Sequence, residues 1–157
     1  ILLDDNLYPK ISDFGLSKEI LLDKHLTEYP LGTPRYIAPE IWRDYEYTEA
    51  VDVYAFSMIV YEIITNEQPF KEFDDIKQIF TEVCIQNYRP ELNFPIPTSY
   101  KELIQRCWSS KPEKRPAFTE IVENLENDGF ITPEIDFVEF NKFISLVKSS
   151  DEPKIDS

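Results

Sequence analysis

Near the start of the chain, the residues best suited to chemistry are Asp13, Phe14 and Gly15, which follow an extended segment with several apolar residues. A glycine at this place allows the backbone to turn sharply and leaves the preceding carboxylate exposed. Carboxylate oxygens are ligands that Mg²⁺ prefers. Asp13 is therefore a candidate magnesium ligand, although three such residues taken alone more often mark a plain turn.

Three later stretches of the sequence make a functional role for Asp13, Phe14 and Gly15 more specific. The first is "GTPRYIAPE", which ends at Glu40, and the second is "DVYAFSMIVYEII", which begins at Asp52. The third is "CWSSKPEKRPAF", which contains Arg115. A carboxylate on an otherwise apolar helix is costly if it is buried without hydrogen bonds. For Asp52 the alternative is an ordinary helix-start aspartate, favoured by the helix dipole.

In this order, the four stretches resemble the C-terminal part of a eukaryotic protein kinase domain, over about residues 1–126. "GTPRYIAPE" and "CWSSKPEKRPAF" are most similar to the tyrosine-kinase-like branch, whose members mostly phosphorylate serine and threonine. The resemblance implies a signalling transferase that uses ATP and Mg²⁺ to phosphorylate protein serine or threonine, with tyrosine as an alternative acceptor. The expected partners are ATP and a protein substrate.

The resemblance also implies a role for each matching residue. Asp13 would hold Mg²⁺ against the nucleotide phosphates. Phe14 would pack into the core, and Gly15 would permit a flip between active and inactive states. Thr33 would be an auxiliary catalytic group that hydrogen-bonds to the catalytic aspartate, and its presence favours serine/threonine specificity.

The segment from Leu16 to Leu31 resembles the activation loop. Its hydroxyl groups belong to Ser17, Thr27 and Tyr29, of which the latter two are the better phosphorylation candidates by position. The alternative is that all three are solvated loop residues.

Three further residues carry structural roles in the resemblance. Glu40 is similar to a glutamate that pairs with a distant arginine, and Arg115 fits that partner. If both are buried, the loss of one leaves the other as an unpaired buried charge, which lowers the free energy of unfolding by about 3–5 kcal/mol. Asp52 would accept backbone N–H bonds from the catalytic loop.

Other parts of the family's machinery are absent from this sequence. The three glycines stand at positions 15, 32 and 129, so no glycine-rich phosphate loop can form, and the single histidine, His25, is not part of a His-Arg-Asp sequence. We expect a truncated kinase lobe that begins just after the catalytic loop, is inactive alone and exposes apolar surface at Ile1–Leu3. The alternative is a non-catalytic kinase-like module for protein binding.

The elements expected to position these residues are mainly helical. The chain predicts a β-hairpin over residues 1–11 and about five helices. Their predicted starts are at Thr48, after Asp75, at a capping box formed by Ser99 and Glu102, near Phe118, and at Thr132. The predicted domains are a partial kinase domain at 1–126, a turn and helix at 127–148, and a disordered tail at 149–157.

Composition excludes several other classes. The net charge of −14 argues against nucleic acid or an anionic membrane as the main partner. The longest apolar run is too short to span a bilayer. Two widely spaced cysteines fit reduced thiols and a cytoplasmic location. A calcium loop at 124–135 would place Ile135 where the bidentate glutamate is needed, so we do not expect one.

Overall fold

The computed structural model describes residues 1–6, 8–16, 25–26, 33–44, 46–126, 130 and 136–150. The predicted phosphorylation sites Ser17, Thr27 and Tyr29 lie outside these residues, and so do Thr132 and the segment 151–157.

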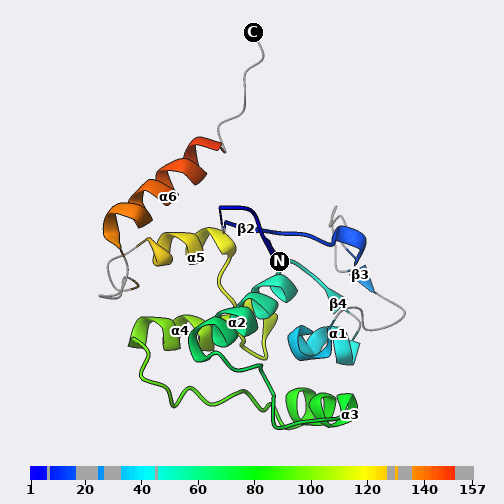
Figure 1. The fold of residues 1–157 in the computed structure, drawn as a ribbon. Coiled ribbons are helices and arrows are strands. Elements are labelled where there is room, and N and C mark those ends of the chain that lie inside the picture. Colours follow the sequence, from blue (N-terminus) through cyan, green and yellow to red (C-terminus); the bar gives the residue numbers. More distant parts are fainter. Residues whose placement is uncertain are drawn as a thin grey trace.

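The described part is mainly helical, as predicted, and its secondary structure comprises four short strands and six α-helices (Figure 1). The strands are β1 (Leu2–Leu3), β2 (Pro9–Lys10), β3 (His25–Leu26) and β4 (Glu46–Tyr47). The helices are α1 (Pro39–Asp44), α2 (Ala50–Thr65), α3 (Ile76–Phe80), α4 (Thr98–Cys107), α5 (Phe118–Leu125) and α6 (Phe137–Ser150). A π-helical turn at Thr81–Ile85 extends α3, and 3₁₀ turns lie at Phe14–Leu16, Pro34–Tyr36 and Pro112–Lys114.

Helix α1 was not predicted, because six residues are too few to show a helical period. Two predicted helix starts differ from the observed ones. Helix α2 begins at Ala50 and not at Thr48. Helix α4 begins at Thr98 with Pro97 at its N-cap, so Ser99 lies in the first turn and not at the cap. Helix α6 begins at Phe137, and the Asp136 carboxylate accepts the backbone N–H groups of Val138 and Glu139 at 2.9 and 3.0 Å. The predicted helix start at Thr132 lies outside the described residues.

Two small antiparallel ladders lie at the start of the chain. The predicted hairpin is present, with Leu2 opposite Lys10 and Leu3 opposite Pro9. A second ladder pairs β3 with β4, which the sequence did not indicate, since β3 lies inside a segment predicted to be a continuous loop. The predicted exposure of Ile1, Leu2 and Leu3 is confirmed, with 63–65% of each residue accessible to solvent.

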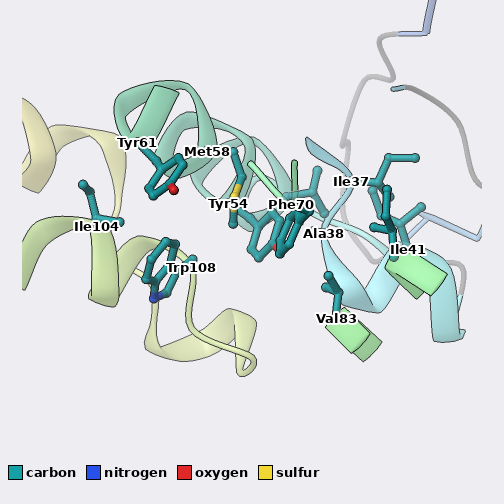
Figure 2. Packing of buried hydrophobic residues seen from close by; sticks show 12 residues of the cluster. Ile37, Ala38, Ile41, Tyr54, Met58, Tyr61, Phe70, Val83, Ile104 and Trp108 are labelled. Atoms are coloured by element: carbon teal, nitrogen blue, oxygen red, sulfur yellow. The ribbon is translucent and has the colours of Figure 1, made fainter. Parts of the chain in front are cut away.

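Helix α2 contributes to both clusters of the hydrophobic core. Figure 1 shows this helix at the centre of the helical part, beside α4. Tyr54, Met58 and Tyr61 on one side of α2 join the larger hydrophobic cluster with Trp108 and residues of α1 and α3 (Figure 2). On another side, Val53 packs with Leu103, Cys107 and Ile121 of α4 and α5. This double contact explains why the α2 sequence is apolar around most of its circumference.

Helix α2 ends at a left-handed C-cap residue. Asn66 adopts the left-handed conformation, with φ 54°, and its N–H donates to the carbonyl of Glu62. Neither Cys84 nor Cys107 forms a disulfide bond, and Cys107 is fully buried. In the described part of the chain, no helix has the length and apolar character needed to cross a membrane.

Candidate functional site

The hairpin that leads to Asp13 is fastened by a second carboxylate in its turn. Asp4 Oδ1 accepts hydrogen bonds from the backbone N–H groups of Asn6 and Tyr8, both at 2.9 Å, and the Asp4 N–H donates to the Tyr8 carbonyl at 3.0 Å. The hydrogen bond from Tyr8 is the main reason why the pKa of Asp4 is lowered. The turn thus fixes where β2 begins, only a few residues before Asp13.

Asp13 is exposed and has an unusual backbone conformation. Its φ of 65° lies in the left-handed region, where few non-glycine residues are found and aspartate is among the best tolerated. Gly15 does not share this conformation, and a methyl group built on it would make only an ordinary contact, 3.5 Å from Asp13 Oδ1. The sharp turn therefore occurs at Asp13 itself, so the sequence interpretation placed the special backbone position at the wrong residue.

Phe14 does not pack into the core, and this expectation was wrong. Its side chain lies in the 3₁₀ turn that follows Asp13, and 67% of the residue is exposed. In the part of the chain that the structure describes, no helix packs over this turn, so the ring remains in solvent.

Thr33 lies at the head of a second turn, which spans residues 33–36. Its side chain is exposed, and its carbonyl accepts the N–H of Tyr36 at 3.0 Å. The turn has two anchors. Arg35 donates to carbonyl groups in the loop between α2 and α3, and the Tyr36 hydroxyl donates to Glu62 Oε2 of α2 at 2.6 Å. Neither anchor was identified in the sequence.

The expected partner of Glu40 is present. Arg115 forms two parallel hydrogen bonds to the Glu40 carboxylate, at 2.6 and 2.8 Å, and the exposed fractions of the two side chains are 0% and 3%. The guanidinium also donates to the carbonyls of Ser109 and Ala50 at 2.9 and 2.7 Å. This bidentate geometry suits arginine and could not be reproduced by lysine. The pair ties the start of α1 to the segments before α2 and α5.

The ring of Tyr54 lies between this pair and a second arginine. The guanidinium carbons of Arg115 and Arg89 are 5.2 and 5.3 Å from the ring centroid. Arg89 donates to the carbonyls of Trp108 and Tyr88 at 2.9 and 2.7 Å, and its pKa is lowered mainly by burial. Cation–π contacts of this kind are favourable when water is excluded. The three residues of these cation–π contacts stand at no characteristic spacing in the sequence, so the sequence did not predict this arrangement.

Asp52 lies in the first turn of α2, and its side chain is exposed. It lines an open groove of about 560 Å³ together with Glu49, Arg115 and Phe118. Partial burial, and then the charge of Glu49, raises its pKa. Within the described residues no hydrogen bond reaches its carboxylate. The catalytic loop that was expected to donate to it is absent from residues 1–157, so the acceptor role stays a prediction.

The predicted site residues thus form two separate groups. Glu40, Arg115 and Asp52 come together at the start of α2, where Arg115 and Asp52 line the same groove. Asp13 and Thr33 lie on exposed turns, and in the described part no hydrogen bond or ion pair joins either of them to the other or to that group. Nor do the described residues contain a cluster of three or more histidine, cysteine, aspartate or glutamate side chains that could hold a metal ion.

The phenol groups near the site predict a stability change at alkaline pH. Burial and the hydrogen bond to Glu62 raise the pKa of Tyr36 to about 12; the hydrogen bond to Glu72 and burial do the same for Tyr88. Because these values lie above the usual 10, unfolding favours ionisation. The stabilisation is complete below pH 10 and is lost as the pH rises from about 10 through about 12.

Tyrosinate absorbance during an alkaline titration checks this expectation. Of the nine tyrosines, Tyr36 and Tyr88 should ionise later than the exposed ones, and replacement of either by phenylalanine should remove one late-titrating group. A single transition of all tyrosines near pH 10 in the folded protein would contradict it.

The chain is similar to known proteins over most of its length. A family model described as "Protein tyrosine and serine/threonine kinase" matches residues 1–125. Three similar proteins come from Dictyostelium discoideum. They are dual specificity protein kinase shkE (34% identical, 89% of this chain and 22% of that protein), probable serine/threonine-protein kinase drkC (40%, 80% and 17%), and dual specificity protein kinase pyk3 (40%, 80% and 9%). The chain therefore spans less than a quarter of the length of these relatives.

Proposed function

The chain belongs to the protein tyrosine and serine/threonine kinase family, and from this we propose that it is part of an enzyme that transfers the γ-phosphoryl group of ATP to a protein hydroxyl group. The observation that carries the proposal is the family match over residues 1–125, which includes Asp13, Thr33, Glu40 and Arg115. The relatives named as serine/threonine and dual specificity kinases support protein side chains as acceptors.

Serine and threonine are the proposed acceptors. Thr33 supports this choice, because it matches the threonine that stands before the substrate-docking segment in the serine/threonine kinases that the sequence resembles. Its exposed position at the head of the 33–36 turn leaves the hydroxyl accessible.

Mg²⁺ and ATP are the proposed cofactors, and Asp13 is the residue of this chain that would hold the metal. A single exposed carboxylate fits Mg²⁺, which is commonly bound by one or two carboxylates together with substrate phosphates. The metal would neutralise charge on the phosphates.

The remaining residues of the site serve the docking segment, residues 33–40. The buried bond between Glu40 and Arg115 holds its end against the helical core, and Arg35 and Tyr36 hold its start. The segment can therefore present one defined surface to a protein substrate. Residues 1–157 contain neither a glycine-rich loop nor a His-Arg-Asp sequence, so we propose that they are inactive on their own.

A radiolabel assay tests the proposal. The full-length protein that contains this chain, incubated with γ-labelled ATP, Mg²⁺ and casein, should label itself or casein on serine and threonine, as read by phosphoamino-acid analysis. Residues 1–157 alone should transfer nothing. Absence of transfer by the full-length protein would overturn the proposed function. Label mainly on tyrosine would overturn only the choice of acceptor, and transfer by residues 1–157 only their proposed inactivity.

A further inference from the structure

The turn of residues 33–36 is held by Arg35, whose hydrogen bonds within the described part of the chain all go to backbone carbonyls. Arg35 Nη1 donates to the carbonyls of Pro69, at 3.0 Å, and of Phe70, and its Nη2 donates to the carbonyl of Phe73 at 2.9 Å. A planar guanidinium presents several donors in fixed directions, so three carbonyl oxygens must converge on it. The position of Arg35 therefore depends on the shape of the 66–73 loop.

That loop has an unusual backbone at the point of contact. Phe70 has a φ of 55°, in the left-handed region, and only 1% of the residue is exposed. A bulky residue in this conformation is an outlier that persists only when its surroundings determine it. Here the ring is buried near Tyr88, at 6.3 Å between centroids, and the carbonyl is bound by Arg35. The bond from Arg35 thus helps to hold Phe70 in its left-handed conformation, and this conformation in turn places the Phe70 carbonyl within reach of Arg35.

The second anchor of the turn is independent of this loop. The Tyr36 hydroxyl binds Glu62 on α2, whereas Arg35 reaches past α2 to the segment before α3. Without Arg35, the turn would be held by Tyr36 and by the buried residues Ile37 and Ala38, all at or beyond its C-terminal end. Arg35 supplies the additional contacts that fix its orientation.

We propose that Arg35 is a positioning residue for protein substrates. By donating hydrogen bonds to carbonyl groups of the 66–73 loop, it sets the orientation of the turn that carries Thr33. This inference rests on the proposed kinase function for its substrate part. Arg35 itself is not proposed to touch the substrate, because both of its terminal nitrogens donate to the loop. Its effect should appear in how a polypeptide acceptor docks, and not in how ATP binds.

Two measurements on the full-length protein test the proposal. The variants are Arg35→Lys, which keeps the charge but not the planar fork, and Arg35→Gln. Arg106→Gln is the matched control, because Arg106 is half exposed and its ion pair with Glu120 lies at the surface. The first measurement is amide hydrogen exchange at Tyr36 and Ile37, whose N–H groups close the turn. The second is steady-state kinetics with a peptide library that carries one central serine or threonine, with the KM for ATP as reference.

For both Arg35 variants, exchange at Tyr36 and Ile37 should accelerate about tenfold relative to the control. KM for the peptide library should rise about tenfold, while KM for ATP stays unchanged. Unchanged exchange overturns the positioning role, whether or not the protein is a kinase. Faster exchange with an unchanged peptide KM overturns the substrate part. If the wild type transfers no phosphate, the proposed function fails and the substrate part fails with it, while the exchange data still decide whether Arg35 orients the turn.

Discussion

Replacement of Arg115 by methionine is expected to lower the free energy of unfolding by about 3–5 kcal/mol, because it leaves the buried Glu40 carboxylate without its partner charge. Glu40 is 3% exposed and its two oxygens are bound by the guanidinium. Arg115 also satisfies the carbonyls of Ser109 and Ala50, so its loss leaves further acceptors unpaired. Urea unfolding followed by tryptophan fluorescence measures the change.

The matched control is Arg106→Met, which removes an arginine from an ion pair at the surface. Its side chain and that of Glu120 are 48% and 45% exposed, so the expected loss is below about 1 kcal/mol. The double variant Glu40→Leu/Arg115→Met should be more stable than Arg115→Met alone, since no unpaired charge remains in the core. Equal effects of the methionine variants at 115 and 106 would show that burial of the pair does not matter.

Replacement of Asp13 by asparagine is expected to reduce phosphoryl transfer by the full-length protein about 10³-fold. The substitution keeps the size of the side chain and removes the charge that would bind Mg²⁺. A bound metal ion contributes several kcal/mol of transition-state stabilisation, and each 1.36 kcal/mol changes the rate tenfold. Asparagine also tolerates the left-handed φ of 65° found here, so the fold should be unaffected.

Initial rates with γ-labelled ATP at saturating Mg²⁺ measure this loss. Asp136→Asn is the control, because Asp136 caps α6 through backbone N–H groups and asparagine caps a helix equally well. It should retain full activity. If the Asp13 variant keeps more than a tenth of wild-type activity, the role of Asp13 as a metal ligand is wrong.

Side-chain patterns predicted most of the helices, and the resemblance to protein kinases implied the long-range ion pair. The apolar residues of α2 and α4 recur with a helical period, which sequence records directly, and Glu40 and Arg115 stand in stretches that resemble a known family. The short α1 carried no such period. The acceptors of Arg35 are backbone carbonyls, which every residue possesses, so nothing in the sequence marks them.

Exposure was harder to predict than secondary structure, because it depends on what packs nearby. Phe14 and Asp52 were both expected to have neighbours that the described residues do not provide. Ile63 shows the same effect on α2: it belongs to a strongly apolar helix, yet 75% of it is exposed. For Asp13 and Gly15 the sequence indicated a turn correctly but not which residue adopts the left-handed conformation.

The pairing of Glu40 with Arg115 has a kinetic consequence. The two residues are 75 positions apart, so the intervening chain must be closed into a loop before their bond can form, whereas α2 and α4 form from local contacts. We infer that the docking segment reaches its place late in folding, after the rate-limiting barrier. Weakening this pair would then hasten unfolding and leave the folding rate nearly unchanged. The bond would therefore govern how long the docking surface persists once it has formed.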